Sequence, residues 1–265
     1  MSKLEGVADT LFIPLVSRIY VSNRFPDYFY DQMALSLESE IESENIKKNT
    51  SEYLHMASVA RYYHLDSWTR KFLASYEKCN VINLGAGLET AYFRLNNKRD
   101  LFYEVDTSEV IENRRKVLGE CENEFLIASD IFSLEWVKLI DTTLPSLFIV
   151  SGVFQYYQEP KILEFIRALK EAFPNGELIF DATNEKGLKF ANKYVKKTGN
   201  TSAPMYFFVN DASLLAQKSS TTLIECRPFF EAARKMLAKR LKITTRLIMK
   251  IVDLSGRAIL VHLKL

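Results

Sequence analysis

VINLGAGLETAYFRL, residues 81–95, is the most informative stretch of this chain. A short apolar run, typical of a strand buried on both faces, leads through Gly85, Ala86 and Gly87 into residues with a helical pattern. Glycine suits such a turn because the chain leaves the strand sharply and a ligand can approach the backbone closely. In an open α/β sheet the turn lies in the crevice beyond the strand's carboxyl end. We therefore predict that residues 85–87 bind a nucleotide-type ligand; a plain tight turn is the alternative.

The residue that follows the loop indicates which ligand binds there. A dinucleotide fingerprint has a third glycine three residues after the second, where this chain has Thr90. That glycine allows the close helix packing that a pyrophosphate requires, whereas S-adenosylmethionine (SAM) has no phosphate and tolerates a bulkier residue. The loop therefore favours SAM over a nicotinamide dinucleotide.

Short apolar runs recur from residue 79 onward and are separated by helical stretches, which is typical of a parallel sheet with helices between its strands. The clearest helix is predicted at residues 159–173, where apolar positions share one face and Pro-Asn-Gly follows at 174–176. The strand candidates are residues 81–84, 101–105, 125–129, 147–151, 177–181, 222–227 and 258–265. The pattern predicts an α/β fold.

Acidic residues close the second and third strand candidates. Asp106 lies 21 positions after Gly85 (106 − 85), close to the spacing at which a carboxylate binds ribose hydroxyls. Glu104 is the competing candidate, and capping of the next helix is an alternative role for Asp106. After the third strand, Asp130 can accept from an adenine amino group while Ile131 offers an apolar wall to the ring.

Two segments outside this core also have a recognisable composition. Residues 1–77 have apolar positions at helical spacing and predict an N-terminal helical cap ahead of a cofactor-binding domain at residues 78–265. Within the cap, the Glu-rich residues 38–52 predict an exposed connection.

Residues 228–250 carry seven basic residues against the single acid Glu231, interleaved with apolar ones. We interpret residues 228–253 as a helical lid insertion with a solvated outer face. Attraction of an acidic substrate, an acyl-carrier partner or a membrane surface is the alternative interpretation.

Composition limits the class of protein. The formal net charge of +2 is far from the strongly basic balance of nucleic-acid-binding domains, so nucleic acid is not an expected partner. Cys79, Cys121 and Cys226 suggest neither a disulfide framework nor a metal site, and we expect buried free thiols. The first residues do not resemble a signal peptide, and no run reaches the roughly 18 apolar residues of a membrane span. A cytoplasmic protein is predicted.

Six segments together point to a known family. They are TLFIPLVSRIYVSNRFPDYFYDQMA, ARYYHLDSWTRKFL, VINLGAGLETAYFRL, FYEVDTSEVIENRRKVL, IVSGVFQYY and the tail from VNDASLL to AILVHLKL. In this order they resemble the leucine carboxyl methyltransferase-like family, in particular its bacterial branch similar to tetracenomycin polyketide O-methyltransferases. The resemblance covers nearly the whole chain. It implies a class I SAM-dependent methyltransferase fold, Rossmann-like, with seven strands of which the last is antiparallel, and a helical lid.

The resemblance also implies roles for individual residues. Arg61, in ARYYHLD, matches the arginine that binds the methionine carboxylate of SAM, a task suited to a planar bidentate donor. The other matches are Gly85 and Gly87 in the cofactor loop, Asp106 for the ribose, Asp130 with Ile131 for the adenine, and Tyr156 beyond the fourth strand. Ser151-Gly152 departs from the family's acid followed by a small residue. A hydroxyl is a weaker partner for the SAM ammonium group, so we expect lower affinity or another acid in compensation.

These residues predict a SAM-dependent O-methyltransferase with Tyr156 and Ser151 at the reacting end. Its acceptor would be a carboxylate or hydroxyl of a small, polyketide-like molecule, free or carrier-bound. A sulfonium methyl is already activated, so the protein mainly positions the acceptor oxygen and excludes water, and only a phenol needs a base. The histidines lie in no recognisable catalytic pattern, and structural roles are expected for His55 and His262. A NAD-type oxidoreductase and a non-catalytic binding protein are the alternatives.

Overall fold

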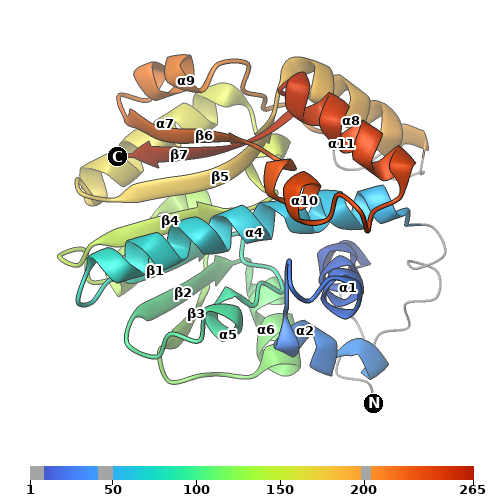
Figure 1. Ribbon diagram of the computed structural model, residues 1–265. Coiled ribbons are helices and arrows are strands. Elements are labelled where there is room, and N and C mark those ends of the chain that lie inside the picture. The colour runs from blue at the N-terminus through green and yellow to red at the C-terminus, as the bar shows by residue number, and fades with distance from the viewer. Residues whose placement is uncertain (1–8, 41–49, 198–203) are drawn as a thin grey trace.

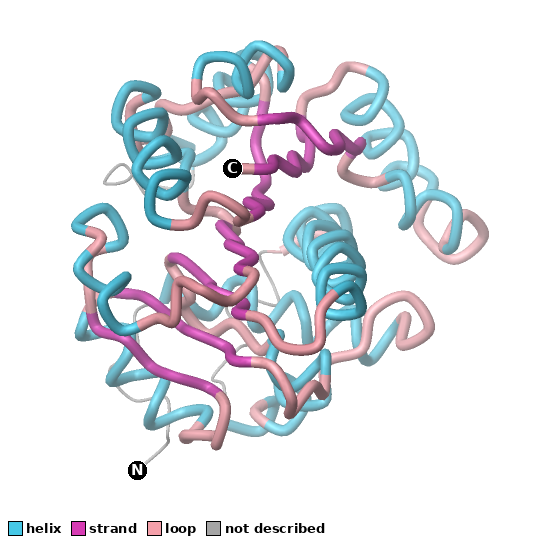
Figure 2. The backbone as a smooth tube through the Cα atoms, turned by 90° about the vertical axis from the view of Figure 1, so that its left-hand side faces the viewer, coloured by secondary structure: helices cyan, strands magenta, loops and turns pink. Residues whose placement is uncertain are grey.

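A seven-stranded sheet with helices on both faces forms the centre of the computed structural model, which describes residues 9–40, 50–197 and 204–265 (Figures 1 and 2). The strands lie in the order β3-β2-β1-β4-β5-β7-β6, and β7 runs opposite to the other six. They are β1 (Asn80–Leu84), β2 (Leu101–Asp106), β3 (Glu124–Ala128), β4 (Ser146–Val150), β5 (Glu177–Thr183), β6 (Thr222–Pro228) and β7 (Ala258–Lys264). The predicted seven-stranded α/β fold and all seven strand candidates are confirmed.

The central strands are apolar throughout because alternate side chains enter two different cores. Ile82 and Phe148 pack on one face of the sheet, whereas Val81 and Leu147 pack on the other. Fully burying such a side chain is worth about 1.5–3 kcal/mol. The first face is covered by α7 (Glu159–Ala172) and α9 (Ala212–Lys218), and the second by α4 (Glu52–Ser75), α10 (Glu231–Met236) and α11 (Ile243–Leu254).

The other helical elements of the described residues lie outside these two sets, and three of them contribute to a third core cluster. These other elements are α1 (Asp9–Arg24), α2 (Gln32–Ser36), η1 (Glu38–Glu40), α5 (Ala91–Leu95), α6 (Ser108–Leu118), η2 (Ile131–Ser133), η3 (Glu135–Leu139), η4 (Phe154–Tyr156) and α8 (Glu185–Lys197). The helix predicted at residues 159–173 is confirmed as α7, which ends where the Gly176 N–H donates to the Phe173 carbonyl.

The predicted exposed connection at residues 38–52 is wrong at its second end, where the chain is helical and buried. Its first residues form η1, and Glu52 opens α4 after the Ser51 cap. Glu52 is buried, and its carboxylate accepts the Lys242 N–H at 2.8 Å. Residues 41–49 lie outside the described part of the chain. The basic segment 228–250 forms two helices, α10 and α11, and its role as a lid stays a prediction.

The cysteines and histidines lie in different surroundings in the folded protein. Cys79 is buried as predicted, but Cys226 is exposed, so the expectation of buried thiols is wrong there. His55 Nδ1 lies 3.2 Å from Ser17 Oγ, and His262 Nε2 lies 2.8 Å from a Glu177 oxygen. Within the described ranges, no helix has both the length and the apolar character needed to cross a membrane.

Candidate cofactor site

A cavity of about 660 Å³ lies at the carboxyl ends of β1, β2 and β3. Five of the residues predicted from the sequence line it: Gly85, Gly87, Asp106, Asp130 and Ile131. The rest of its wall consists of Thr107, Ser108, Ala128, Ser129, Val153, Tyr157 and Lys161. The strand ends therefore bring the glycine loop and two of the predicted acids to one cavity.

The glycine loop has the geometry that its sequence requires. Gly85 has a φ of +72°, and a side chain at this position would run into Val153. Asp106 accepts the Gly87 N–H at 2.9 Å with one oxygen and the Thr107 N–H at 2.7 Å with the other. Ala86, between the glycines, is buried. Burial raises the pKa of Asp106. The Asp106 carboxylate supports the loop through these two hydrogen bonds and still has lone pairs for a ligand on the cavity side.

Two buried arginines hold the carbonyl side of the same loop. Arg114 donates to the Gly87 oxygen at 3.3 Å and to the Glu89 oxygen at 2.5 Å. Arg18, from α1, donates to the Leu88 oxygen at 2.6 Å. Three successive carbonyl groups thus accept charge-assisted hydrogen bonds, which fix the loop from behind.

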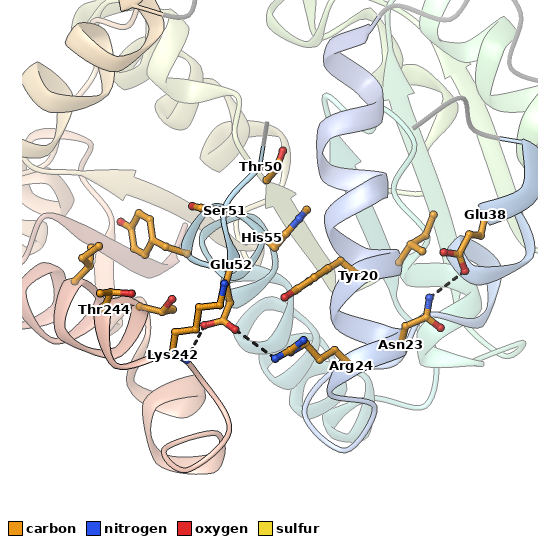
Figure 3. Close-up of a pocket in the computed structure, with 14 residues that line it drawn as sticks. Tyr20, Asn23, Arg24, Glu38, Thr50, Ser51, Glu52, His55, Lys242 and Thr244 are labelled. Carbon is orange, nitrogen blue, oxygen red and sulfur yellow. Dashed lines mark hydrogen bonds and ion pairs between the residues drawn. The ribbon is translucent and has the colours of Figure 1, made fainter. Parts of the chain in front are cut away.

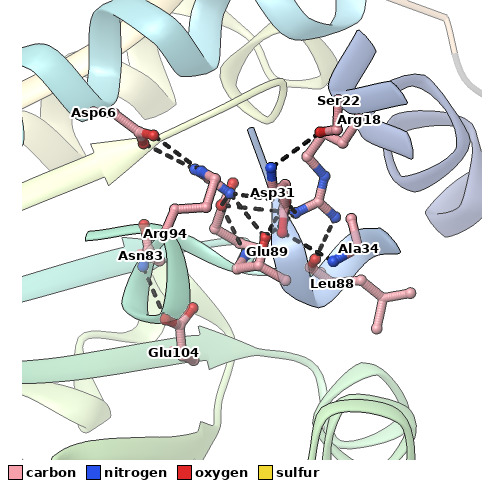
Figure 4. Close-up of polar contacts among 12 residues, drawn as sticks. Arg18, Ser22, Asp31, Ala34, Asp66, Asn83, Leu88, Glu89, Arg94 and Glu104 are labelled. Atoms are coloured by element: carbon pink, nitrogen blue, oxygen red, sulfur yellow. Dashed lines mark hydrogen bonds and ion pairs between the residues drawn. The ribbon is translucent and has the colours of Figure 1, made fainter. Parts of the chain in front are cut away.

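A buried ionic network joins the N-terminal helices to the loop (Figure 4). Arg18 pairs with Asp31 at 3.0 Å, and Arg94 pairs with Asp66 at 2.8 Å and with Glu89 at 2.6 Å. Burial alone would raise the pKa of Glu89, but Arg94 and Arg18 outweigh it and lower that pKa to about 2. The network holds α1 and α4 against the cofactor side of the sheet.

Glu104, the alternative to Asp106, lies elsewhere. Its side chain is completely buried between Asn83 at 2.9 Å and Arg114 at 3.4 Å. Burial raises the pKa of Glu104. The structure places Asp106 in the cavity wall and Glu104 inside the protein beneath it.

At the β3 end, Asp130 and Ile131 form a wall with polar and apolar parts. Asp130 is exposed and accepts the Phe132 N–H at 2.9 Å, while Ile131 is buried. Tyr157 and Lys161 also line the cavity, and the Lys161 ammonium lies 4.1 Å from the centre of the Phe132 ring. This mixture suits a flat heterocycle with polar edges.

A second group of polar residues continues the site beyond β1, at the ends of β4 and β5. Arg61, from α4, lies 3.5 Å from a carboxylate oxygen of Asp181. The other Asp181 oxygen accepts the Gly152 N–H at 2.6 Å. Gly152 has a φ of +72°, and a side chain there would approach the Arg61 guanidinium. These three residues, with Ser151, are called the Arg61 cluster below.

Two polar atoms of this cluster have no partner among the described residues. Ser151 Oγ and Arg61 Nε are both buried and form no hydrogen bond. Buried polar groups are nearly always paired with protein, water or a ligand, so both atoms are available to a ligand at this position. Val153 follows two residues after Ser151 and lines the cavity, which makes the cluster an extension of it. From β3 to β5 the edge spans four strand spacings, about 19 Å, which suits an extended nucleoside with an amino-acid tail.

Tyr156 does not line the cavity. It ends η4, its side chain is 41% exposed, and its N–H donates to the Val153 carbonyl. Asp181 was not predicted, although this acid follows an apolar run near the carboxyl end of its strand, much as Asp106 does. Arg18 and Arg114 were not predicted either, because the sequence offers no local signal for them.

A larger cavity of about 800 Å³ lies where α1 and the start of α4 approach Lys242 and α11 (Figure 3). Tyr20 stacks on His55 there, with ring centres 4.1 Å apart, and Arg24 lies 3.9 Å from Glu52. This cavity shares no lining residue with the one at the glycine loop. We assign the cofactor to the smaller cavity because only that one contains the loop and the strand ends.

The sheet order, the antiparallel β7, the glycine loop after β1 and the acid after β2 define a class I SAM-dependent methyltransferase. The leucine carboxyl methyltransferase family matches residues 9–170, more than half of the chain, and the chain belongs to this family. It is 27% identical over 203 residues, 75% of each chain, to the tetracenomycin polyketide synthesis O-methyltransferase TcmP of Streptomyces glaucescens.

Solved structures show the same fold. A DUF574 family protein from Streptomyces avermitilis is 10% identical with a TM-score of 0.57, covering 94% of this chain and 96% of its own. Magnesium protoporphyrin IX methyltransferase (ChlM) from Synechocystis, crystallised with S-adenosylhomocysteine, is 12% identical with a TM-score of 0.53, covering 95% and 99%. The protein is therefore a SAM-dependent methyltransferase, and the oxidoreductase and non-catalytic alternatives are not favoured.

Proposed function

We propose that this enzyme transfers the methyl group of SAM to a carboxylate oxygen of a small molecule. The observation that carries the proposal is the acid–base character of the site: among the described residues, no histidine lines the cofactor cavity. Burial lowers the pKa of His55 and His64 to about 4. A carboxylate is already ionised at neutral pH, so it needs no base. The description of the family, leucine carboxyl methyltransferase, supports the same acceptor class.

A hydroxyl group of a polyketide-like molecule is the second candidate. It is favoured by the similarity to TcmP, which is described as an O-methyltransferase of tetracenomycin polyketide synthesis. A phenol must lose its proton, and the acids nearest the cofactor site are Asp106, Asp130 and Asp181. An aspartate is a weak base for a phenol with a pKa near 10, which ranks this candidate second. Presentation of either acceptor by a carrier is compatible with the proposal.

The cofactor residues take the following roles in this proposal. Asp106 accepts from the ribose hydroxyls, because its carboxylate already lies at the cavity edge. Asp130 and Ile131 bind the adenine, and Arg61 binds the methionine carboxylate with its planar guanidinium. When bound, SAM supplies a methyl group on a positively charged sulfur. The protein's own task is to align the acceptor and exclude water.

Asp181 is the acid that compensates for the hydroxyl of Ser151 as a partner for the SAM ammonium group. The β4 end has a hydroxyl where the family has a carboxylate, but β5 is the neighbouring strand and presents Asp181 to the same backbone. Its carboxylate holds Arg61 and can accept from an ammonium group beside it. Ser151 Oγ, which is buried and unpaired, is then available to hydrogen-bond the acceptor where the methyl group is transferred. Tyr156 would contact the acceptor from the exposed side.

Isotopic labelling tests the acceptor class. Purified enzyme is incubated with SAM carrying a labelled methyl group and with matched pairs of aromatic polyketides that bear either a free carboxyl or only hydroxyl groups. We expect label on the carboxylated member, released as methanol by mild alkali because a methyl ester hydrolyses and a methyl ether does not. Label that resists alkali would assign the hydroxyl instead. No transfer to any member, despite SAM binding by calorimetry, would reject both classes.

A further inference from the structure

Helix α11 leaves one apolar side uncovered. It packs on the rest of the protein through Thr245, Met249 and Val252. At about 100° per residue, four large aliphatic side chains fall within an arc of about 80° on the opposite side of the helix. These residues, called the aliphatic stripe, are Ile243 (71% exposed), Leu247 (56%), Ile251 (53%) and Leu254 (76%). A contiguous exposed apolar surface marks an interaction site, so the exposure of all four side chains indicates an occupant.

Cations without partners lie beside the stripe. Lys242, Arg246 and Lys250 are exposed and have no ion-pair partner within the described parts of the chain. The acids nearby are already used, since Asp253 pairs with Arg234 at 2.8 Å, Glu231 with Lys235 at 2.6 Å and Glu52 with Arg24 at 3.9 Å. This side of α11 therefore combines apolar surface with uncompensated positive charge.

A groove of about 670 Å³ runs between α10 and α11. Ile243, Leu247 and Leu254 lie along it, together with Arg246 and Lys250. The apolar and cationic groups are thus mixed over one continuous surface. Figure 1 shows α10 and α11 on the outside of the molecule, where another body can reach them.

We propose that α11 attaches the protein to the surface of an anionic lipid membrane. An apolar stripe flanked by lysine and arginine is the pattern of a helix that lies in the membrane interface, with aliphatic groups among the acyl chains and cations at the phosphates. The twelve residues of α11 span about 18 Å, which suits a helix lying flat and not one that crosses. The packing of Met249 and Val252 fixes the stripe outward, so binding requires no folding step.

A bilayer matches this surface better than a protein partner does. Binding hot spots between proteins are enriched in Trp, Tyr and Arg, whereas the stripe is entirely Ile and Leu. A protein partner also needs a polar rim with donors and acceptors, but the unpaired charges here are all cations. A uniformly negative surface over an apolar interior complements both features.

Attachment through α11 would also orient the cofactor site. α11 leads into β7, whose first residue, Ala258, pairs with Thr183 at the carboxyl end of β5. Asp181 lies two residues before Thr183, on the edge that carries the cofactor residues. Because α11 covers the second face of the sheet with its stripe outward, that face would turn toward the lipid surface, and the cofactor edge would lie at its side.

Vesicle flotation tests the proposal with the full-length protein. Vesicles of phosphatidylcholine alone and of phosphatidylcholine with phosphatidylglycerol are compared at low and high salt. We expect binding only to the anionic vesicles, and less of it at high salt, because the attraction is screened. The triple variant Ile243→Ser, Leu247→Ser, Leu254→Ser and the double variant Arg246→Glu, Lys250→Glu should each lower the partition coefficient by about tenfold or more.

Matched controls alter equally exposed residues on other elements. Leu139→Ser with Leu214→Ser, and Lys98→Glu with Lys116→Glu, should leave vesicle binding unchanged. SAM affinity, measured on every variant, shows that the fold is intact. Failure to bind anionic vesicles at low salt overturns the proposal, as does binding that survives both the triple and the double variant. A dimer in light scattering that the triple variant converts to a monomer would assign the stripe to a second copy of the chain instead.

Discussion

The two halves of the cofactor site differ in how the chain builds them. In the half at β1, β2 and β3, each predicted residue lies at the end of its strand or within a few positions after it, as Asp106 and Gly85 do. In the Arg61 cluster, Arg61 precedes Gly152 by 91 positions (152 − 61) and Asp181 by 120 (181 − 61). The first half is a property of single strand–loop units, whereas the second exists only when α4, β4 and β5 are assembled.

Both halves nevertheless depend on the buried ionic network for stability. Asp106 supports the glycine loop from the neighbouring strand, but Arg18 also holds it from 70 positions away. Arg61 depends on the position of α4, which the Asp66–Arg94 pair and its neighbour Glu89 hold against the sheet. Changes in the buried network should therefore affect both the Arg61 cluster and the glycine loop.

The largest effect is expected from removing the cation of the Arg61 cluster. Arg61→Ala deletes the proposed partner of the methionine carboxylate and leaves Asp181 without its ion pair. Loss of two charge-assisted hydrogen bonds costs about 3 kcal/mol or more, so SAM affinity should fall at least about 100-fold in calorimetry. The control is Arg70→Ala, an exposed arginine of the same helix. An affinity within threefold of the wild type would remove Arg61 from the cofactor site.

Glu89→Gln tests the network that holds this half. Because the folded-state pKa of Glu89 is lowered from 4.5 to about 2, its carboxylate contributes stability that is present above pH 4.5 and is lost as the pH falls toward 2. The shift corresponds to about 3 kcal/mol. Urea unfolding should show the variant less stable at pH 7 by about this amount, with the difference vanishing near pH 2. Glu120→Gln, in an exposed pair with Arg115, should change stability by less than about 1 kcal/mol. A constant difference between wild type and Glu89→Gln across this pH range would contradict the assignment.

Asp106→Asn tests the half built from local motifs. The amide removes the negative charge that would accept hydrogen bonds from the ribose hydroxyls. This loss should cost about 2 kcal/mol of binding free energy and lower SAM affinity roughly 30-fold. Burial raises the pKa of Asp106 above its ordinary 3.8, so wild-type affinity should fall as the pH is lowered through that raised value. The variant should lack this dependence. The two proteins are compared by SAM titration from pH 7 downward, and parallel pH profiles would exclude a ribose role.

The sequence predicts what local periodicity determines. Strands buried on both faces appear as apolar runs, and a glycine loop followed by an acid at the right spacing gives Gly85, Gly87 and Asp106. The choice between Glu104 and Asp106 requires knowing how deeply each side chain is buried in the folded protein. Both point to the same side of β2, but only Asp106 lies at the end of the strand, whereas Glu104 is covered and meets Arg114.

Other features depend on contacts distant in sequence. That β5 lies beside β4, and so brings Asp181 to Gly152, follows from the strand order and not from either segment. The same holds for Arg18, which reaches Leu88 from 70 positions away. The uncovered side of α11 could not be predicted either, because an apolar helix face is normally buried and its burial depends on the neighbours that the fold supplies.

The smallest effect is expected from exchanging the acid between the two strands of the Arg61 cluster. Asp181→Asn keeps an oxygen that can accept the Gly152 N–H but loses the charge beside Arg61, so SAM affinity should fall about tenfold. If the site requires one carboxylate from either β4 or β5, adding Ser151→Asp to this variant should restore part of the loss. Asp141→Asn, an exposed aspartate after η3, serves as the neutral control. Unchanged affinity in Asp181→Asn would remove the carboxylate from the proposal. A loss that Ser151→Asp does not relieve would show that the acid must lie on β5, where it can contact Arg61 and the Gly152 backbone at the same time.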